Sequence, residues 1–175
     1  MFKAQIEMRL KPTLFAAAAA ALMVAIVPGA PAHADGEPII GAPGGEPYTA
    51  NCPNGGFLTG VHARAGSYVD SLRGHCQGGD TVAFGGAGGE DMERNCPAGH
   101  LVTGVLVTWG WWVDSIYLVC SSPDLAGSSE TLDGIGGNGG SYSQLFQCPQ
   151  GTAAVTMRGG AGQFVNRIGL VCKAR

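Results

Sequence analysis

Three segments of this chain align with one another without a gap, and this repeat constrains the fold more than any other feature. Each segment begins with one cysteine and ends with another 24 positions later, at 52–76, 96–120 and 148–172, so all six cysteines are used. All three start with Cys-Pro-x-Gly and share a glycine, an aromatic residue and a valine at matching places. The chain is therefore a threefold repeat, and any fold or function must accommodate three related units.

The N-terminus predicts export from the cell. A basic leader precedes an apolar run over 14–27 that is too short to span a bilayer, and Ala32-His33-Ala34 is typical of a cleavage site. We therefore predict that 1–34 is a signal peptide and that 35–175 is a single domain containing the three repeats. The expected product is secreted or periplasmic, without membrane insertion, since no long apolar run follows the leader.

The charge of the chain argues against two classes of partner. The whole sequence has a formal net charge of −3, and removal of the basic leader makes the remainder more acidic. Nucleic acids and anionic membranes both attract basic surfaces. We therefore expect no nucleic-acid partner, whereas assembly into a homo-oligomer stays open.

The cysteines predict disulfide bonds. An even cysteine count in an exported chain favours disulfides, and the absence of a C-x-x-C pair argues against zinc. A loop of this length contributes about 3 kcal/mol when closed by an unstrained disulfide. Because the spacing is equal, the simplest connectivity lies within repeats: Cys52–Cys76, Cys96–Cys120 and Cys148–Cys172.

The pattern inside each repeat is that of a β-hairpin. Two runs rich in β-branched, aromatic and leucine residues, 101–109 and 113–120, are joined by Gly110-Trp111-Trp112. The first and third repeats copy the first run at 57–65 and 153–161. No stretch after the leader sustains a helical period, and the 30 glycines favour tight turns, so the chain is predicted to be all-β.

Two motif matches are coincidental, and no catalytic motif is found. The spacing of Gly134, Gly136 and Gly139 fits a dinucleotide fingerprint, but no helix follows it. The stretch 85–91 faintly resembles a calcium-binding repeat but lacks tandem copies. Because G-x-S-x-G, H-E-x-x-H and a catalytic cysteine signal are all missing, we predict no enzyme, no metal and no cofactor.

Each repeat contains, in order, a glycine-rich loop, a strand, a motif of the type G-x-x-x-D and an apolar strand. This order resembles the repeat of jacalin-related lectins, and the resemblance covers nearly all of 40–172. Segments 66–70 (GSYVD) and 110–114 (GWWVD) fit the motif, whereas 162–166 (GQFVN) has asparagine in the acidic place. The resemblance implies a β-prism I fold, in which three four-stranded Greek-key sheets surround a pseudo-threefold axis, here with one disulfide per repeat. It also implies a lectin that binds mannose-, glucose- or galactose-type glycans.

The cysteines also give a second resemblance and an alternative function. Typical plant members of that family lack them, whereas vitelline membrane outer layer proteins, also β-prisms, carry a similar Cys-Pro-x-Gly and a terminal Leu-x-Cys. The alternative is therefore a secreted structural, inhibitory or protein-interaction β-prism that has no sugar site.

The chemistry of the motif suits a hexose. A sugar needs a fixed carboxylate, nearby backbone N–H donors and an aromatic wall for its weakly apolar face. We expect Asp70 and Asp114 to accept hydroxyl hydrogen bonds and the aromatic residue two positions earlier to shield the ring. Gly66 and Gly110 are expected to turn with positive φ and to leave room for the ligand. The predicted carbohydrate-binding residues are Gly66, Tyr68, Asp70, Gly85, Gly86, Gly110, Trp112, Asp114, Gly136, Gly137, Gly162, Phe164 and Asn166.

The resemblance also implies how the pockets are assembled. Asp70 should face the glycine loop 85–89, Asp114 the loop 136–140, and Asn166 the short loop 44–45. The competing interpretation is that the acidic residues only stabilise turns and that the aromatic residues belong to the core. Trp111 and Trp112 should point in opposite directions in an extended segment, so one of them should be exposed.

Overall fold

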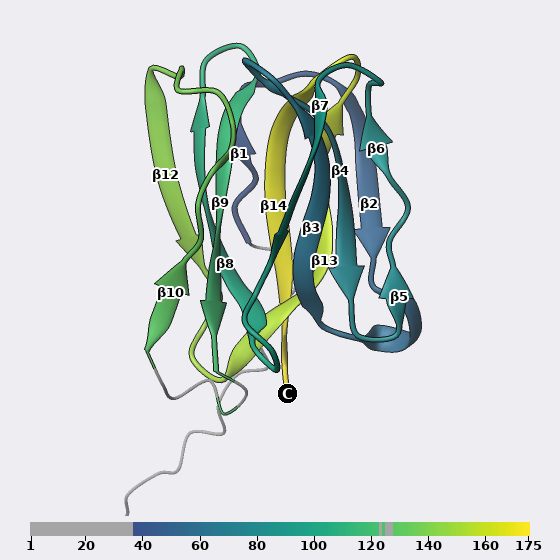
Figure 1. The fold of residues 1–175 in the computed structure, drawn as a ribbon, viewed down its shortest axis with the longest axis vertical. Helices are drawn as coiled ribbons and strands as arrows, with labels where there is room; N and C mark the ends of the chain where they lie inside the picture. Colours follow the sequence, from purple (N-terminus) through teal and green to yellow (C-terminus); the bar gives the residue numbers. More distant parts are fainter. Residues whose placement is uncertain (1–36, 123, 125–127) are drawn as a thin grey trace, which may run out of the picture. The chain divides into compact units, whose positions relative to one another are not determined.

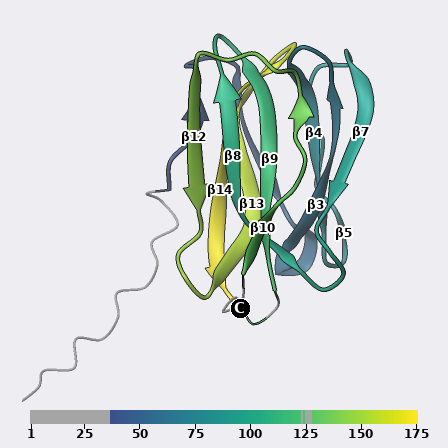
Figure 2. The ribbon, with the colours of Figure 1, turned by 60° about the vertical axis from the view of Figure 1, so that its left-hand side comes forward.

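The computed structural model describes residues 37–122, 124 and 128–175, and the predicted signal peptide lies outside them. Strands dominate this part of the chain, which otherwise has one short 3-10 helix, Pro53–Gly55. Three antiparallel sheets are present, each with one hairpin at its centre (Figures 1 and 2). We call them the first, second and third sheets, after the repeat that supplies the hairpin.

The strands of each sheet are given in spatial order. The first sheet contains β5 (Gly79–Asp80), β4 (Val69–Cys76), β3 (Leu58–Ala65) and β7 (Glu90–Asn95), and β6 (Phe84–Gly85) also pairs with β4. The second contains β10 (Ser129–Thr131), β9 (Val113–Ser121), β8 (Leu101–Trp109) and β12 (Tyr142–Gln147), and β11 (Ile135–Gly136) also pairs with β9. The third contains β1 (Ile40–Gly41), β14 (Val165–Ala174), β13 (Thr152–Ala161) and β2 (Glu46–Asn51).

These sheets confirm the predicted all-β, β-prism I architecture. Each sheet has four strand positions, because β5 and β6 share one edge of the first sheet and β10 and β11 share one edge of the second. The hairpin predicted in the second repeat appears as β8 and β9, with β9 one residue longer than expected. The equivalent hairpins β3–β4 and β13–β14 complete the pseudo-threefold set.

Each sheet combines two repeats. The strand that follows each glycine loop does not pair with the hairpin of its own repeat. Instead β7 pairs with β3, β12 with β8, and β2 with β13. The first strands of the chain therefore close onto the last hairpin, which places each glycine loop beside a turn from the preceding repeat.

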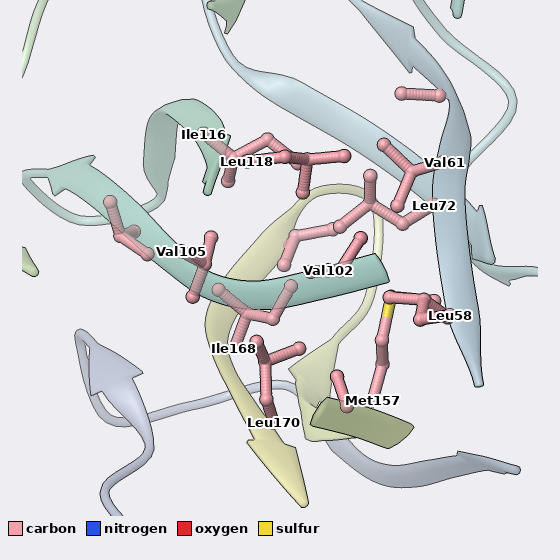
Figure 3. Packing of buried hydrophobic residues seen from close by; sticks show 14 of the residues in the cluster. Leu58, Val61, Leu72, Val102, Val105, Ile116, Leu118, Met157, Ile168 and Leu170 are labelled. Carbon is pink, nitrogen blue, oxygen red and sulfur yellow. The ribbon is translucent and has the colours of Figure 1, made fainter. Parts of the chain in front are cut away.

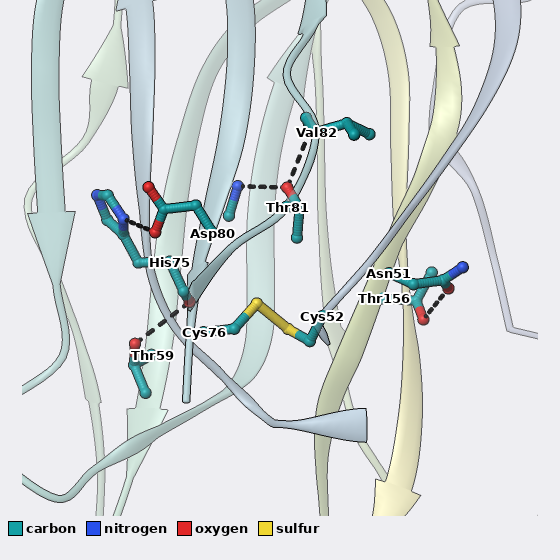
Figure 4. The surroundings of a disulfide bond; sticks show 10 residues. Asn51, Cys52, Thr59, His75, Cys76, Asp80, Thr81, Val82 and Thr156 are labelled. Atoms are coloured by element: carbon teal, nitrogen blue, oxygen red, sulfur yellow. Dashed lines mark hydrogen bonds and ion pairs between the residues drawn. A yellow bond between two sulfur atoms is a disulfide. The ribbon is translucent and has the colours of Figure 1, made fainter. Parts of the chain in front are cut away.

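The disulfides pair within repeats, as predicted, and they join the three sheets in a ring. Cys52 follows β2 of the third sheet and bonds Cys76 of β4 in the first sheet, with a Cα–Cα distance of 5.7 Å. Threonine hydroxyls hydrogen-bond within the two sheets beside this disulfide (Figure 4). The other two disulfides, Cys96–Cys120 and Cys148–Cys172, link the first sheet to the second and the second to the third.

The core lies where the inner faces of the sheets meet (Figure 3). Side chains from all three hairpins contribute, which explains why the apolar positions recur in every repeat. No helix in the described residues is long and apolar enough to cross a membrane. The buried side chains labelled in Figure 3 are Leu58, Val61, Leu72, Val102, Val105, Ile116, Leu118, Met157, Ile168 and Leu170.

Candidate functional site

The three hairpin turns meet at one end of the sheets through their aromatic side chains. The ring centroids of Tyr68 and Trp112 are 5.0 Å apart, and those of Tyr68 and Phe164 are 5.4 Å apart. Trp112 and Phe164 complete the triangle at 5.0 Å. All three rings are partly buried. The aromatic residues therefore pack on one another at the centre of this end, instead of each standing alone in a separate pocket.

The glycine that opens each turn has the same backbone geometry in all three repeats. The N–H of Gly66 donates to the carbonyl of Tyr68 at 2.9 Å, and Gly110 and Gly162 make the matching bond. The prediction that Gly66 and Gly110 adopt positive φ is wrong, because positive φ occurs in the glycine loops instead. A Cβ on Gly66 or Gly162 would meet nothing, so these positions border open space.

The second site is formed by Asp114 and the glycine loop 136–140. Asp114 is 5% exposed and is the second residue of β9. Gly139 lies so close that a Cβ there would collide with the carboxylate Oδ1, and the N–H of Gly137 donates to the Asp114 carbonyl at 2.9 Å. Gly136 has φ of +110°, which L side chains rarely adopt. The loop thus approaches the carboxylate as closely as it does because it lacks side chains.

The Asp114 carboxylate is not fully satisfied. Its Oδ2 atom is buried and has no hydrogen-bond partner among the described residues. Burial raises the pKa of Asp114 above its ordinary value, while the Gly110 amide has a smaller, lowering effect. That amide already donates to the Trp112 carbonyl at 3.0 Å. A buried acceptor without a donor is costly, so this atom is suited to receive a hydrogen bond from a ligand.

A hollow of about 320 Å³ adjoins this carboxylate. One side is the glycine loop, and the other is the turn of the first repeat, which contributes Tyr68. The aromatic side chain beside Asp114 therefore comes from a different repeat, a partner that the linear motif does not reveal. The lining residues are Ser67, Tyr68, Asp114, Gly137, Asn138 and Gly139.

The first site repeats this arrangement around Asp70. Asp70 is 6% exposed, and a Cβ on Gly88 would collide with its Oδ1. A Cβ on Gly89 would lie 2.7 Å from Oδ2. The N–H of Gly86 donates to the Asp70 carbonyl at 2.8 Å. Burial raises the pKa of Asp70, and the positive charge of Arg64 partly offsets that effect.

The third site differs in both of its parts. The Asn166 amide lies beside Gly44 and Gly45, and its Nδ2 reaches the Trp111 carbonyl at 3.5 Å. This loop is short and lies between Pro43 and Pro47, which have no N–H to offer. The third site therefore has neither a carboxylate nor a long glycine loop.

Every site takes one component from each repeat. Gly86 in the first site packs on the backbone of Gln163, and Gly137 in the second packs on Ser67. In the third, Asn166 contacts Trp111. The structure thus brings each acidic or amide residue to its expected glycine loop, and it adds to each site a turn from the remaining repeat, which sequence reasoning missed. The expected closure of the last repeat onto the first was the signal that could have revealed this additional turn.

Two further predictions concern exposure and metal binding. Trp111 is 83% exposed and Trp112 is partly buried, as their opposite directions required. Within the described residues, no group of three or more His, Cys, Asp or Glu side chains is arranged to hold a metal ion.

The fold has clear counterparts among solved structures. No family model matches the sequence, and no curated protein matches it. In structure, 79% of the chain matches 96% of Malaysian banana lectin, with a TM-score of 0.63 and 17% identity. The fold is that of the jacalin-related lectins. Calystegia sepium agglutinin matches with a TM-score of 0.63 at 18% identity, over 79% of this chain and 97% of the agglutinin.

Artocarpin, a lectin with mannose specificity, has the same fold, with a TM-score of 0.62 at 12% identity over 78% of this chain and 97% of artocarpin. Identities this low establish the β-prism alone. What the chain binds must be argued from its own side chains.

Proposed function

We propose that this protein is a lectin that binds hexose units of glycans at the first and second sites, without a metal or other cofactor. Asp70 and Asp114 accept hydrogen bonds from adjacent sugar hydroxyls, and the glycine loops admit the ring close to the backbone. Tyr68 supplies the apolar wall of the second site. The glycan-binding lectins that share the fold support the same class of ligand.

The single observation that carries this proposal is the hollow of about 320 Å³ that Asp114 lines together with Tyr68 and the glycine loop. An aspartate that only stabilised a turn would need no open space beside its carboxylate, because its partners would be local N–H groups. Here Asp114 lines the hollow, and its Oδ2 atom has no hydrogen-bond partner among the described residues. A sugar hydroxyl placed in that hollow would satisfy the carboxylate with a charge-assisted hydrogen bond, which is roughly twice as strong as a neutral one.

The proposal also includes export. Three disulfides are typical of oxidising compartments, and the N-terminal 34 residues resemble a signal peptide. Sequencing the N-terminus of the protein recovered from an exporting host tests this part directly. A mature chain that starts at Asp35 agrees with it, and a chain that retains Met1 in the cytoplasm contradicts it.

A glycan array tests the binding function. The wild-type protein should bind hexose-containing glycans, and a double variant, Asp70→Asn with Asp114→Asn, should lose that signal. Glu130→Gln, an exposed acidic residue on β10, provides a matched control that should bind like wild type. EDTA should leave the wild-type signal unchanged, since protein groups and not a bound cation contact the sugar. An equal signal from the double variant would reject the two assigned sites, and a wild type that binds no glycan would favour a structural β-prism.

A further inference from the structure

Two arginines are neighbours on the outer face of the third sheet. Arg158 of β13 and Arg167 of β14 are diagonal to each other, since each pairs with a glycine two positions from the other. Diagonal neighbours are separated by about 7–8 Å, which long side chains can bridge. Met157 and Ile168, which alternate with the arginines along the strands, are fully buried. The two guanidinium groups therefore point away from the core on one side of the sheet.

Neither arginine has a carboxylate partner among the described residues, in contrast with the ion-paired arginines of the first sheet. The Nε atoms of Arg158 and Arg167 also have no hydrogen-bond partner there. Nη2 of Arg158 donates to the carbonyl oxygen of Glu37 at 2.7 Å, while the Glu37 carboxylate accepts from the N–H of Cys172. Two cations held this close repel each other, so an anion between them would be stabilising.

The arginine pair occurs only in the third repeat. Arg167 corresponds to Ser71 and Ser115, each of which follows the aspartate of its motif. Where the first two repeats have Asp-Ser, the third has Asn166-Arg167, so one negative charge is lost and one positive charge is gained. Arg158 likewise takes the place of a histidine and a leucine. The β-prism therefore does not need arginine at either position, and the pair calls for a reason other than the fold.

We propose that Arg158 and Arg167 bind the oxyanion of an acidic sugar, either a sulfate ester or a carboxylate. A planar guanidinium matches the paired oxygens of both groups in a bidentate contact. Thr49, which is exposed on β2 and pairs with Arg158, offers a hydroxyl to the sugar that carries the anion. The chain's net charge of −3 disfavours densely anionic polymers and membranes, so a single anion on an otherwise neutral glycan suits the site.

This site goes beyond the proposed function and does not require hexose binding at the first or second site. The test therefore uses the double variant Asp70→Asn with Asp114→Asn, in which the two hexose sites do not contribute. Methyl α-galactoside, its 6-sulfate and methyl α-galacturonide are titrated separately, with sodium chloride at matched ionic strength as a blank. ¹H–¹⁵N NMR follows the Nε–H signals of the arginines, and the shifts give Kd.

Both acidic sugars should shift the Nε–H signals of Arg158 and Arg167, and the neutral galactoside should not. The acidic sugar that binds more tightly identifies the anion as sulfate or carboxylate. Raising sodium chloride to about 0.5 M should weaken binding by screening the charges.

Substitutions taken from the other repeats test the two side chains. Arg167→Ser and Arg158→Leu should each raise Kd by about 10-fold or more, because each removes a charge-assisted contact. Arg167→Lys keeps the charge but not the planar fork, so it should retain part of the affinity. Arg73→Thr, at an ion-paired arginine of the first sheet, should bind like the parent. Circular dichroism verifies the fold of each variant.

Three results would overturn the anion site: shifts that sodium chloride alone reproduces, equal binding of the neutral galactoside, or a Kd that Arg167→Ser leaves unchanged. Because the measurement is made without the hexose sites, its failure leaves the lectin function standing. A wild type that binds no neutral glycan on the array would reject the lectin function and leave the anion site standing.

Discussion

Arg64 holds in place the glycine loop that lies against Asp70. Its Nε donates to the carbonyl oxygens of Ala87 and Gly88 at 3.1 and 2.9 Å, and its Nη2 donates to that of Gly89 at 2.6 Å. Thr108 takes the equivalent place in the second repeat and bonds Ser115 instead, at 2.7 Å. The first site therefore depends on one cation for the shape of its loop, and the second does not.

Replacing Arg64 by the threonine of the second repeat should weaken the first site selectively. Arg64→Thr removes three hydrogen bonds from the loop, and we expect a loss of sugar affinity of about 10-fold there. Stability should fall by about 1 kcal/mol or more, because the side chain is partly buried and its hydrogen bonds to the loop are lost. Calorimetry in an Asp114→Asn background measures the first site alone. Arg73→Thr, which breaks an exposed ion pair with Asp80, is the control that should bind normally.

The raised pKa of Asp114 predicts opposite effects of pH on binding and stability. Binding uses the ionised carboxylate, so affinity should fall as pH is lowered through the raised pKa, at a higher pH than for an exposed aspartate, whose pKa is about 3.9. Without ligand, the folded state binds the proton more tightly than the unfolded state. The carboxylate therefore costs stability as pH rises through its raised pKa, and the cost persists at neutral pH.

Asp114→Asn should consequently stabilise the free protein at pH 7 and have little effect at pH 3, where the carboxyl is neutral in both states. Urea unfolding at the two pH values measures the difference, and calorimetry should show that the same variant no longer binds at the second site. A variant equally destabilised at both pH values would mean that Asp114 is a structural turn residue.

Each disulfide should contribute to stability without determining the strand pattern. Removing one disulfide with Cys96→Ser and Cys120→Ser opens a loop of 24 positions and should cost about 3 kcal/mol. The other two pairs close loops of the same length, so their removal should cost a similar amount. Thermal unfolding followed by circular dichroism measures both stability and strand content. Loss of the strand signal in the variant at temperatures below its unfolding transition would contradict the account.

Much of this architecture was readable from the repeat. Equal cysteine spacing predicted the disulfide pairing, and the two runs of strand-forming residues on either side of Gly110 predicted the β8–β9 hairpin within a residue. These features depend on short-range order, which the sequence encodes locally. The prediction that the glycine loops lie beside the acidic residues came from the family resemblance. It agrees with the contacts of Asp70 and Asp114.

The features that escaped prediction depend on closure of the three sheets. The meeting of Tyr68, Trp112 and Phe164 and the contact of Gly137 with Ser67 join residues from different repeats. Such contacts depend on how the three sheets are rotated about a common axis. The sequence of a single repeat does not encode that rotation. The split edge strands and the pairing of Trp109 with Tyr142 depend in the same way on register between distant segments.

The third site should be the weakest of the three. Asn166 retains a carbonyl acceptor but has no charge, and its loop lies between two prolines. We therefore expect Asn166→Ala to leave the number and affinity of the sugar sites unchanged. Titration of that variant beside wild type provides the check, and loss of a binding site on this substitution would show that the carboxylate is not the essential group.

The most direct test of the account is the number of hexose sites per chain, measured by titration calorimetry with the monosaccharide that the glycan array selects. We predict two sites per chain for wild type, one for Asp70→Asn, one for Asp114→Asn and none for the double variant. Circular dichroism of each variant verifies that the fold is retained. Two sites that persist in the double variant, or binding mainly through the third repeat, would contradict the account.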